Sequence, residues 1–493
     1  MAYKHGSYGN IGDSITESTV QASTNVIYIG KAPINLVKGF KDKNLVNTFI
    51  EVSDKTDAYS KIGYSSDWES FTLSEPVAAH FDNRNGNIGP IYIINVLNPE
   101  VHKKSDKTTK EISFTNGRAE FQSDTIILDS ITLAEKVLDV DYSVDYNFTK
   151  GTVILQSLEA ETINGSVICS YDEVDVSLIT ENDIIGTVTA NEEYSGLALL
   201  ELFNVETNKV PNLLAIPGYM DKPKVYSAAV TATNAVDEQW QCFVCSDLPV
   251  IEGKEKIDTR EKALQWKEKN NYNSDRAKSI WPMAYDSQTG RIYHGSVLMV
   301  VEFMRQDANN NGIPKDTCSN KKVPITGLYF GKDSKSKGFG RSKANKLNEK
   351  GITTYIRSNG NWVIWGGHTD AYSYGTEMDA KVIFDTYIRM LFHIVNDFQV
   401  KYADDIDKGL SLQRKDSIIN EEQEFLDLLV AVEGLVGTPK VLFLTKDNPT
   451  ADIVNGDFDF DIPVTVTPQG KSYTAKVYYT DEGVASYVGE EAA

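Results

Sequence analysis

The sequence predicts a multidomain protein of mixed α/β and α+β class, with a β-rich insertion domain and an extended arm at each end. Three observations predict this fold. Buried strands and helices alternate in residues 23–99 and again in 186–370, as in a parallel α/β sheet. Residues 100–185, between them, show strand patterns and hairpin turns. At 493 residues the chain is also too long for a single hydrophobic core.

Bulk composition excludes several classes of protein. Hydrophobic residues make up 41% of the chain, which is typical of globular domains, and the net charge of -21 argues against a general nucleic-acid binder. The N-terminus lacks the apolar stretch of a secretory signal, and the longest apolar run, 297–303, is far shorter than the roughly 20 residues that span a bilayer. Four cysteines in so long a chain do not form a disulfide framework. We therefore expect synthesis in the cytoplasm and no direct insertion into a membrane.

The first elements in chain order are an arm and an α/β unit. Residues 1–22 are small and polar and predict an extended arm, from about Ser7 to Ala22. A buried strand at 25–30, a helix at 71–81 and a second buried strand at 91–97 then follow. This order indicates the first part of a parallel α/β domain.

Residues 100–185, which we call the insert, form a separate β domain in this interpretation. A charged linker at 98–110 leads into a predicted hairpin at 111–122, whose Asn116-Gly117 pair supplies the positive φ angles of a type I′ turn. A second hairpin is predicted at 141–155. The charged linker and the hairpins place the insert on the outer surface of the protein.

Alternation of helix and strand resumes in residues 186–370. The predicted elements are helices at 195–205 and 225–236, and strands at 213–217 and 242–245. Seven lysines and arginines stand among glycines and serines in 332–350, which predicts a mobile, exposed loop. Such a basic run could contact nucleic acid, but it is more often a solvated loop.

Residues 371–470 predict a C-terminal α+β domain. A continuous apolar stripe indicates a helix within 377–402, and Asn420 is a suitable N-cap for a second helix that ends by 434–439. Short strands are predicted at 441–444 and 462–467.

A C-terminal arm, 471–493, completes the chain. Within Ser472–Thr480 the alternation places Tyr473, Ala475, Val477 and Tyr479 on one face of a strand. Almost no later residues remain to pair with this strand, and its backbone groups need hydrogen-bond partners. We expect a neighbouring subunit to supply them by strand addition.

No pattern predicts catalysis or a cofactor. Cys242 and Cys245 have the spacing of a zinc ligand pair, but a site needs about two more ligands, and a strand would put the two on opposite faces. Residues 307–312 copy the first half of a calcium loop, yet Cys318 stands where the bidentate glutamate belongs. The six histidines form no metal or triad spacing, and neither a nucleophile elbow nor a phosphate loop is present. Trp362 and Trp365 would face opposite sides of a strand, so a stacking clamp is not expected. We expect no metal, no cofactor and no enzymatic activity.

The chain resembles contractile tail sheath proteins of phages and of related phage-tail-like bacteriocins, over most of its length outside the insert. The segments that carry the resemblance are Asn25–Pro33, Asn85–Val96, Val210–Gly218, Leu347–Ile352 with Val363–Thr369, and Thr445–Ile453 with Gly456. One departure is His368, at a position where the resemblance leads us to expect arginine.

The resemblance implies a structural subunit that forms stacked six-subunit rings around an inner tube and shortens to drive the tube through a cell envelope. The implied partners are neighbouring sheath subunits, the inner tail tube protein, and baseplate and tail terminator proteins, with no nucleic acid. Assembly would take place in the bacterial cytoplasm, and the mature protein would lie in a phage or bacteriocin tail particle. The arms would add strands to the C-terminal domains of neighbours. The residues expected in these strands are Ser14, Ile15, Thr16, Glu17, Tyr473, Ala475, Val477 and Tyr479.

The resemblance also implies that a helix of the C-terminal domain meets the tube, often by charge complementarity. The matching segment, 421–433, is acidic. Either the tube face is basic, or Lys408, Arg414 and Lys415 just before the segment make the contact, and we favour the second. Two alternatives from other classes stay open: an α/β enzyme with a β insert, which lacks a clustered site, and a β-rich surface adhesin, which needs export.

Overall fold

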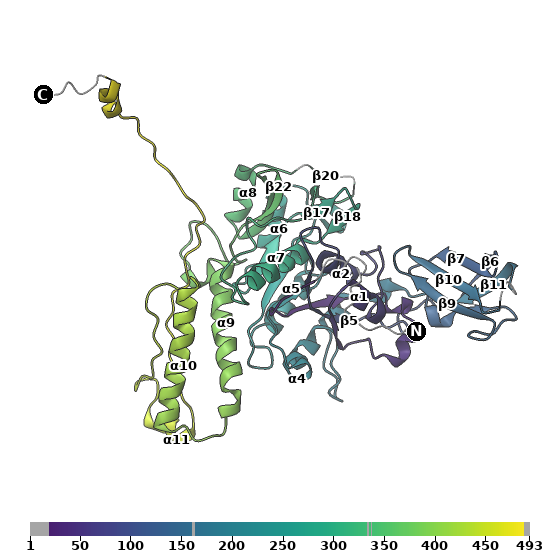
Figure 1. Cartoon of the computed structure of the whole chain (residues 1–493), viewed down its shortest axis with the longest axis horizontal. Coiled ribbons are helices and arrows are strands. Elements are labelled where there is room, and N and C mark those ends of the chain that lie inside the picture. The colour runs from purple at the N-terminus through teal and green to yellow at the C-terminus, as the bar shows by residue number, and fades with distance from the viewer. Residues whose placement is uncertain (1–18, 160–162, 333–334, 337, 488–493) are drawn as a thin grey trace, which may run out of the picture.

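The computed structural model describes residues 19–159, 163–332, 335–336 and 338–487. Figure 1 shows a central α/β part, which we call the body, with the β-rich insert on one side and two long helices on the other. The last described segment leads away from the body as an extended chain (Figure 1). In the part of the chain that the structure describes, no helix has the length and apolar character needed to cross a membrane.

The body is built on an eight-stranded sheet with the order β22-β21-β16-β13-β12-β2-β5-β3. Its strands are β2 (Val26–Gly30), β3 (Phe49–Val52), β5 (Ile91–Asn95), β12 (Leu213–Ala215), β13 (Phe243–Asp247), β16 (Ala277–Ile280), β21 (Ile352–Ser358) and β22 (Asn361–Trp365). The six strands from β21 to β5 run parallel, and only the edge strands β22 and β3 are antiparallel. Strands from both sides of the insert therefore share one sheet.

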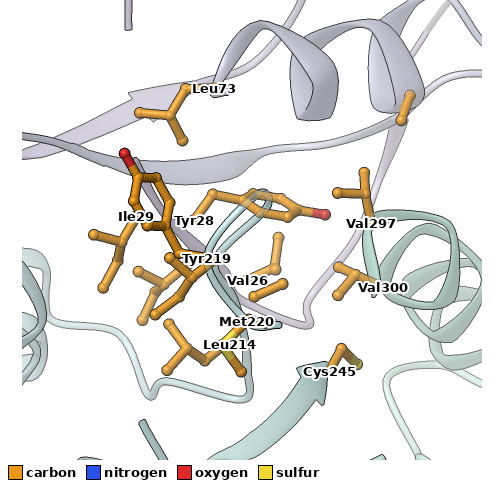
Figure 2. Packing of buried hydrophobic residues seen from close by; sticks show 14 of the residues in the cluster. Val26, Tyr28, Ile29, Leu73, Leu214, Tyr219, Met220, Cys245, Val297 and Val300 are labelled. Atoms are coloured by element: carbon orange, nitrogen blue, oxygen red, sulfur yellow. The ribbon is translucent and has the colours of Figure 1, made fainter. Parts of the chain in front are cut away.

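Helices cover this sheet, and the inner parallel strands are buried on both faces, as parallel strands generally are. The helices are α1 (Lys55–Lys61), α2 (Ser74–Phe81), α3 (Glu181–Ile185), α4 (Phe203–Thr207), α5 (Pro223–Ala232), α6 (Arg260–Lys269), α7 (Gly295–Asn309) and α8 (Arg341–Asn348). Helix α7 crosses the core. Figure 2 shows Val297 and Val300 of this helix beside Val26, Tyr28 and Cys245 from the sheet.

Two buried carboxylates hold the N-terminus of α7. The Ser296 N–H donates to Asp247 Oδ1 at 2.9 Å, and the His294 N–H donates to Glu75 Oε1 at 2.5 Å. The His294 ring also pairs with Glu75, with 2.6 Å between Nδ1 and Oε2. Burial opposes the charged imidazole, but the Glu75 carboxylate outweighs it and raises the pKa of His294 to about 9.

Smaller strands lie around the body. β1 (Val20–Gln21) pairs with β4 (Ile88–Gly89), β14 (Ile251–Glu252) with β15 (Glu255–Lys256), and a four-stranded sheet contains β18 (Arg291–Tyr293), β17 (Met283–Asp286), β19 (Gly327–Tyr329) and β20 (Lys335–Ser336). Residues 332–350 are not one mobile loop, because α8 occupies 341–348. Its Ala344 and Leu347 side chains are buried. The helix expected at 195–205 begins as a 3-10 helix, Gly196–Leu202, before α4.

The insert contains two three-stranded sheets around a core of its own, β7-β10-β9 and β6-β11-β8. The strands are β6 (Thr108–Phe114), β7 (Arg118–Gln122), β8 (Thr132–Leu133), β9 (Tyr142–Asn147), β10 (Thr152–Ser157) and β11 (Gly165–Tyr171). The expected hairpin at 141–155 is confirmed by the antiparallel pairing of β9 with β10.

The hairpin expected at 111–122 is only half right. Asn116 and Gly117 do have φ angles of 53° and 75°. The strands on either side nevertheless part after the turn, because β6 pairs with β11 whereas β7 pairs with β10. The turn is therefore a crossing between the two sheets. The chain enters and leaves the insert side by side, since Lys103 and Val174 form an antiparallel bridge.

The C-terminal domain is an antiparallel pair of helices with an irregular extended layer. Its helices are α9 (Asp385–Tyr402), α10 (Leu412–Ala431) and α11 (Thr450–Asn455). Helix α10 begins before Asn420, because the Ser411 hydroxyl caps it by accepting the Arg414 N–H at 3.1 Å. The strands expected at 441–444 and 462–467 do not form a regular ladder. Only two antiparallel bridges, Leu435 with Val466 and Leu442 with Asp461, join the extended segments.

Candidate assembly surfaces

The segment Ser472–Thr480 is extended and exposed. Tyr473 and Val477 are each 91% exposed and Tyr479 is 88% exposed. The backbone groups of 472–480 make no hydrogen bond to the rest of the described chain. The segment is thus not a strand within one subunit, and its pairing with a neighbour stays a prediction.

The other predicted strand residues, Ser14, Ile15, Thr16 and Glu17, lie outside the described residues. The end of the expected N-terminal arm is held on the body, because Ala22 N–H donates to Gly89 O at 2.7 Å. Thr24 Oγ1 donates to Asp307 Oδ2 at 2.8 Å. Asp307 also forms an ion pair with Arg389 at 2.5 Å. The first residue of the segment that resembles half a calcium loop therefore makes packing contacts within the protein.

A built anchor fixes the start of the C-terminal arm, Pro468–Lys471, which we call the arm root. Gln469 Nε2 donates to Thr386 Oγ1 at 2.6 Å and to Asp385 Oδ1 at 3.4 Å, at the first turn of α9. Its Oε1 lies against Gly367, where an added Cβ would come within 2.6 Å. Lys471 follows over the Tyr372 ring, with Nζ 5.7 Å from the ring centre. The arm therefore leaves the body from a defined point.

Beneath the arm root lies a fully buried ion pair. Lys278 Nζ of β16 is 2.7 Å from Asp385 Oδ2, and the Thr317 hydroxyl donates to the same oxygen at 2.7 Å. Desolvation opposes the charged ammonium, but the Asp385 carboxylate keeps the pKa of Lys278 above its ordinary value. The carboxyl group that Gln469 contacts is thus tied directly to the central sheet.

His368, the departure from the expected arginine, also lies at this junction. Its ring is stacked between Tyr372 and Phe384, with centroid distances of 3.5 and 4.8 Å. Burial lowers its pKa to about 4, so the ring is neutral near pH 7, and Nδ1 lies 2.9 Å from the Ile383 carbonyl oxygen. A neutral flat ring suits this stack.

A backbone edge is open on the C-terminal domain. Asp461 exchanges two hydrogen bonds with Leu442, at 2.8 and 2.9 Å, and Thr465 O accepts the Val436 N–H at 2.9 Å. Because backbone direction alternates along an extended chain, residues 460, 462, 464 and 466 point their N–H and C=O groups the other way. Those groups bond to no described residue. We call residues 460–466 the open edge, and Pro463 within it suits an edge position.

The side chains of the open edge face inward. Phe460, Ile462, Val464 and Val466 are partly buried against the core of the α9–α10 pair. The inward side chains therefore fix how the open edge sits on the C-terminal domain. The backbone groups along its other side stay unpaired.

The three basic residues considered for a tube contact are all matched by carboxylates. Arg414 bonds to Asp405 at 2.5 Å and to Glu421 at 2.7 Å, Lys415 lies 2.9 Å from Asp416, and Lys408 lies 3.8 Å from Asp405. Glu424, Asp427 and Glu433, by contrast, are exposed and form no ion pair with a described residue. The free charge along α10 is therefore negative.

The described residues contain no cluster of three or more histidine, cysteine or acidic side chains that could hold a metal ion. All four cysteines are free and buried. Trp362 is buried, and Trp365 is half-buried, with its Nε1 donating to Asn345 Oδ1 at 3.2 Å. These residues pack the protein.

Comparison with known proteins identifies the class to which this architecture is similar. No family model matches the chain. The chain is 24% identical to the tail sheath protein of Burkholderia phage BcepMu, over 93% of this chain and 96% of that protein. It is 22% identical to the tail sheath protein of Escherichia phage P2, over 63% of this chain and 73% of that protein.

Two solved structures share the fold. A chain of the anti-feeding prophage baseplate has a TM-score of 0.55 and 12% identity, covering 97% of this chain and all of that one. A chain of the contracted PVC sheath, from an extracellular contractile injection system, has a TM-score of 0.52 and 12% identity, covering 98% and 100%.

The resemblance to contractile tail sheath proteins is thereby confirmed, as is the mixed α/β multidomain fold. Both sequence relatives are named tail sheath proteins, which confirms the expectation of a structural protein and not an enzyme.

Proposed function

We propose that this chain is the subunit of a contractile tail sheath. Subunits polymerise as stacked hexameric rings around an inner tube, and contraction of the sheath drives the tube through the envelope of a target cell. The proposal rests on two segments of the chain whose backbones could pair between neighbouring subunits. The arm, 472–480, and the open edge, 460–466, each present unpaired backbone groups that the other can satisfy.

The two segments also match in pattern. In the arm, Tyr473, Ala475, Val477 and Tyr479 alternate with polar residues, except at Tyr478. In the open edge the apolar side chains already face inward, so an added strand would extend an existing apolar face. Each backbone hydrogen bond contributes about 0.5–1.5 kcal/mol net, so several give a link of a few kcal/mol. The N-terminal arm, with Ser14–Glu17, joins the same link between neighbours.

The division of the chain follows from this role. Residues 23–99 and 186–370 form the body, the insert 100–185 lies on the outer surface, and 371–470 form the domain nearest the tube. The arms, 1–22 and 471–493, keep neighbours joined while the bodies change from one packing to another. The energy of contraction then resides in the difference between two packings.

The tube contact is assigned to the acidic face of α10. Lys408, Arg414 and Lys415 were favoured from sequence, but their ion pairs leave little charge for a partner. Glu424 and Asp427 are free to meet a basic tube surface. Baseplate and terminator proteins bind the ends of the sheath. Subunits assemble in the bacterial cytoplasm, and the mature protein lies in a phage or phage-tail-like particle.

Deletion of residues 472–493 tests the proposal. The truncated chain should stay folded, because 472–480 contacts almost nothing within one subunit, but it should not polymerise. Negative-stain electron microscopy distinguishes tubes from monomers, and circular dichroism checks the fold. A second variant, Val477→Pro, removes one N–H from the arm and should weaken tubes. Normal tubes from the truncated chain would refute the proposal.

A further inference from the structure

Two carboxyl groups face each other on the outward side of the open edge. Asp461 exchanges two backbone hydrogen bonds with Leu442. Its side chain points away from the core of the α9–α10 pair, because the alternating neighbours Phe460 and Ile462 are partly buried in that core. Burial and the facing Asp447 carboxyl together raise the pKa of Asp461. Asp461 is half-buried, so its carboxyl group can still be reached from outside.

The described cations nearby do not balance this negative charge. Lys446 is already used, because its Nζ lies 3.0 Å from Asp447 Oδ2. Lys440, earlier in the same segment, is exposed and forms no ion pair with a described carboxylate. Asp459 is exposed and adds a further negative charge that acts on Asp461. The outward side of the open edge therefore favours a cation from a partner.

The arm supplies one basic side chain at its midpoint. Lys476 is the single lysine or arginine in 472–480, and it is exposed and forms no ion pair with a described residue. Alternation places it on the face of the strand opposite the apolar residues Tyr473, Ala475, Val477 and Tyr479. When the arm adds to the open edge with its apolar face inward, Lys476 falls on the outward face, which is the face of Asp461. This holds for a parallel or an antiparallel strand, because paired residues share a face in both.

Charge distinguishes between the registers that remain. Registers that keep the apolar faces together differ by steps of two residues, because a slip of one residue turns every side chain to the other face. They place Lys476 opposite Asp461, Pro463 or Thr465, and Asp461 alone of these three carries a charge. Residues directly opposite each other have Cβ atoms about 5 Å apart, which a lysine side chain can bridge to a carboxylate. In this register residues 460, 462 and 464 still face the arm.

We propose that Lys476 of one copy forms an ion pair with Asp461 of its neighbour and sets the register of the added strand, an inference that rests on the proposed function. The ammonium group offsets the repulsion between Asp461 and Asp447, so an arm in this register stabilises the open edge most. The register also limits the spacing of subunits. The chain from Lys471, at the arm root, to Lys476 spans at most roughly 18 Å, so the arm root of one copy stays within about that reach of the open edge of the next.

Zero-length cross-linking tests the proposal on the assembled full-length chain. A water-soluble carbodiimide activates a carboxyl group, and a lysine amine in contact with it displaces the activating group and forms an amide. Polymers mixed from ¹⁴N and ¹⁵N subunits distinguish links between copies from links within one copy. We expect links between copies from Lys476 to Asp461, or to the facing Asp447, in polymers and not in monomers. The Lys104–Glu173 pair, 3.0 Å apart within one copy, should link in both states. Links from Lys476 only to other carboxylates, or none while the control pair links, would overturn the proposal.

Charge exchange supplies an independent measurement. Lys476→Asp should raise the critical concentration for assembly about twofold to fivefold, the range expected for one cross-strand ion pair, and adding Asp461→Lys should restore it. The matched control combines Asp461→Lys with Lys254→Asp, in the exposed turn between β14 and β15, and has the same composition without the exchanged pair. It should not restore assembly.

Two results of the exchange would contradict the proposal: unchanged assembly of Lys476→Asp, or no recovery in the exchanged variant while circular dichroism shows an intact fold. Tubes that assemble without the Lys476 link leave the sheath function standing. A full-length chain that never forms tubes defeats both.

Discussion

Replacing Gln469 by glutamate should release the arm root from α9. The substitution exchanges an N–H donor for a carboxylate oxygen, placed 3.4 Å from Asp385 Oδ1. Two unit charges at that distance repel by about 5 kcal/mol at an effective dielectric constant of 20. Lys278, 2.7 Å from the same carboxyl group, offsets part of this repulsion, and the side chain of residue 469 is half-buried and can turn away. We therefore expect detachment to become easier by about 2 kcal/mol, roughly thirtyfold in population.

Hydrogen–deuterium exchange of the monomer measures this effect without any polymer. The Thr467 N–H bonds to Gly434 O at 3.1 Å, and the Lys471 N–H bonds to Gln469 O at 2.9 Å. Both amides should exchange faster in Gln469→Glu and by a smaller factor in Gln469→Ala. The control is Gln413→Glu, which adds the same charge at an exposed position on α10. Unchanged protection of both amides in the glutamate variant would refute the anchor.

Three further predictions concern folding and assembly. Excision of 104–173, joined across the Lys103–Val174 bridge, should leave a folded chain that still forms tubes, and a folded chain without tubes would contradict an outer insert. Because the folded-state pKa of His294 is raised to about 9, its pair with Glu75 stabilises fully below pH 6.5 and loses that effect as the pH rises through 9. Urea unfolding at pH 6 and 9.5 should show this loss in the wild type and a smaller one in His294→Gln. Lys278→Met should lower the free energy of unfolding in urea by about 3–5 kcal/mol, because it leaves Asp385 buried without its partner. Adding Asp385→Leu should restore part of that loss. No recovery in the double variant would count against the ion pair as the cause.

The parts of the fold that depend on local pattern could be predicted from the sequence. Strands β2 and β5 are short apolar runs bounded by glycine or proline, and such runs indicate buried parallel strands. The Asn116-Gly117 turn could likewise be predicted from these two residues alone. Which strands pair beyond that turn depends on β10 and β11, far along the chain, and the turn carries no information on it.

The start of α10 was missed for a related reason. Ser411 and Asn420 are both good caps, and Glu422 interrupts the apolar stripe although it is fully buried. It can be buried because Tyr402 of α9 donates to Glu422 Oε1 at 2.9 Å. The contact between α9 and α10 thus places a charged residue on the buried face of α10, and this breaks the apolar pattern by which the helix could be recognised.

The arm was visible in the sequence and its anchor was not. Alternation in 472–480 needs no partner to be recognised, whereas Gln469 gains its role only from Asp385 and Gly367, which are distant in the sequence. The ion pairs of the basic residues near 408–415 were hidden in the same way. Their charges could be counted, but the carboxylates that neutralise them could not.

The two chain segments that lead into and out of the insert meet at one bridge, Lys103 with Val174. Beside it, the Lys104 N–H donates to Glu173 O at 2.9 Å. Any folded module whose own termini lie close together can be spliced there with little added loop-closure entropy. In the proposed sheath, where the insert faces outward, the exterior can thus diverge at one graft point while the body and the C-terminal domain stay unchanged. If the chain polymerises as proposed, the same junction offers a place to display an enzyme or an antigen at regular spacing along the polymer.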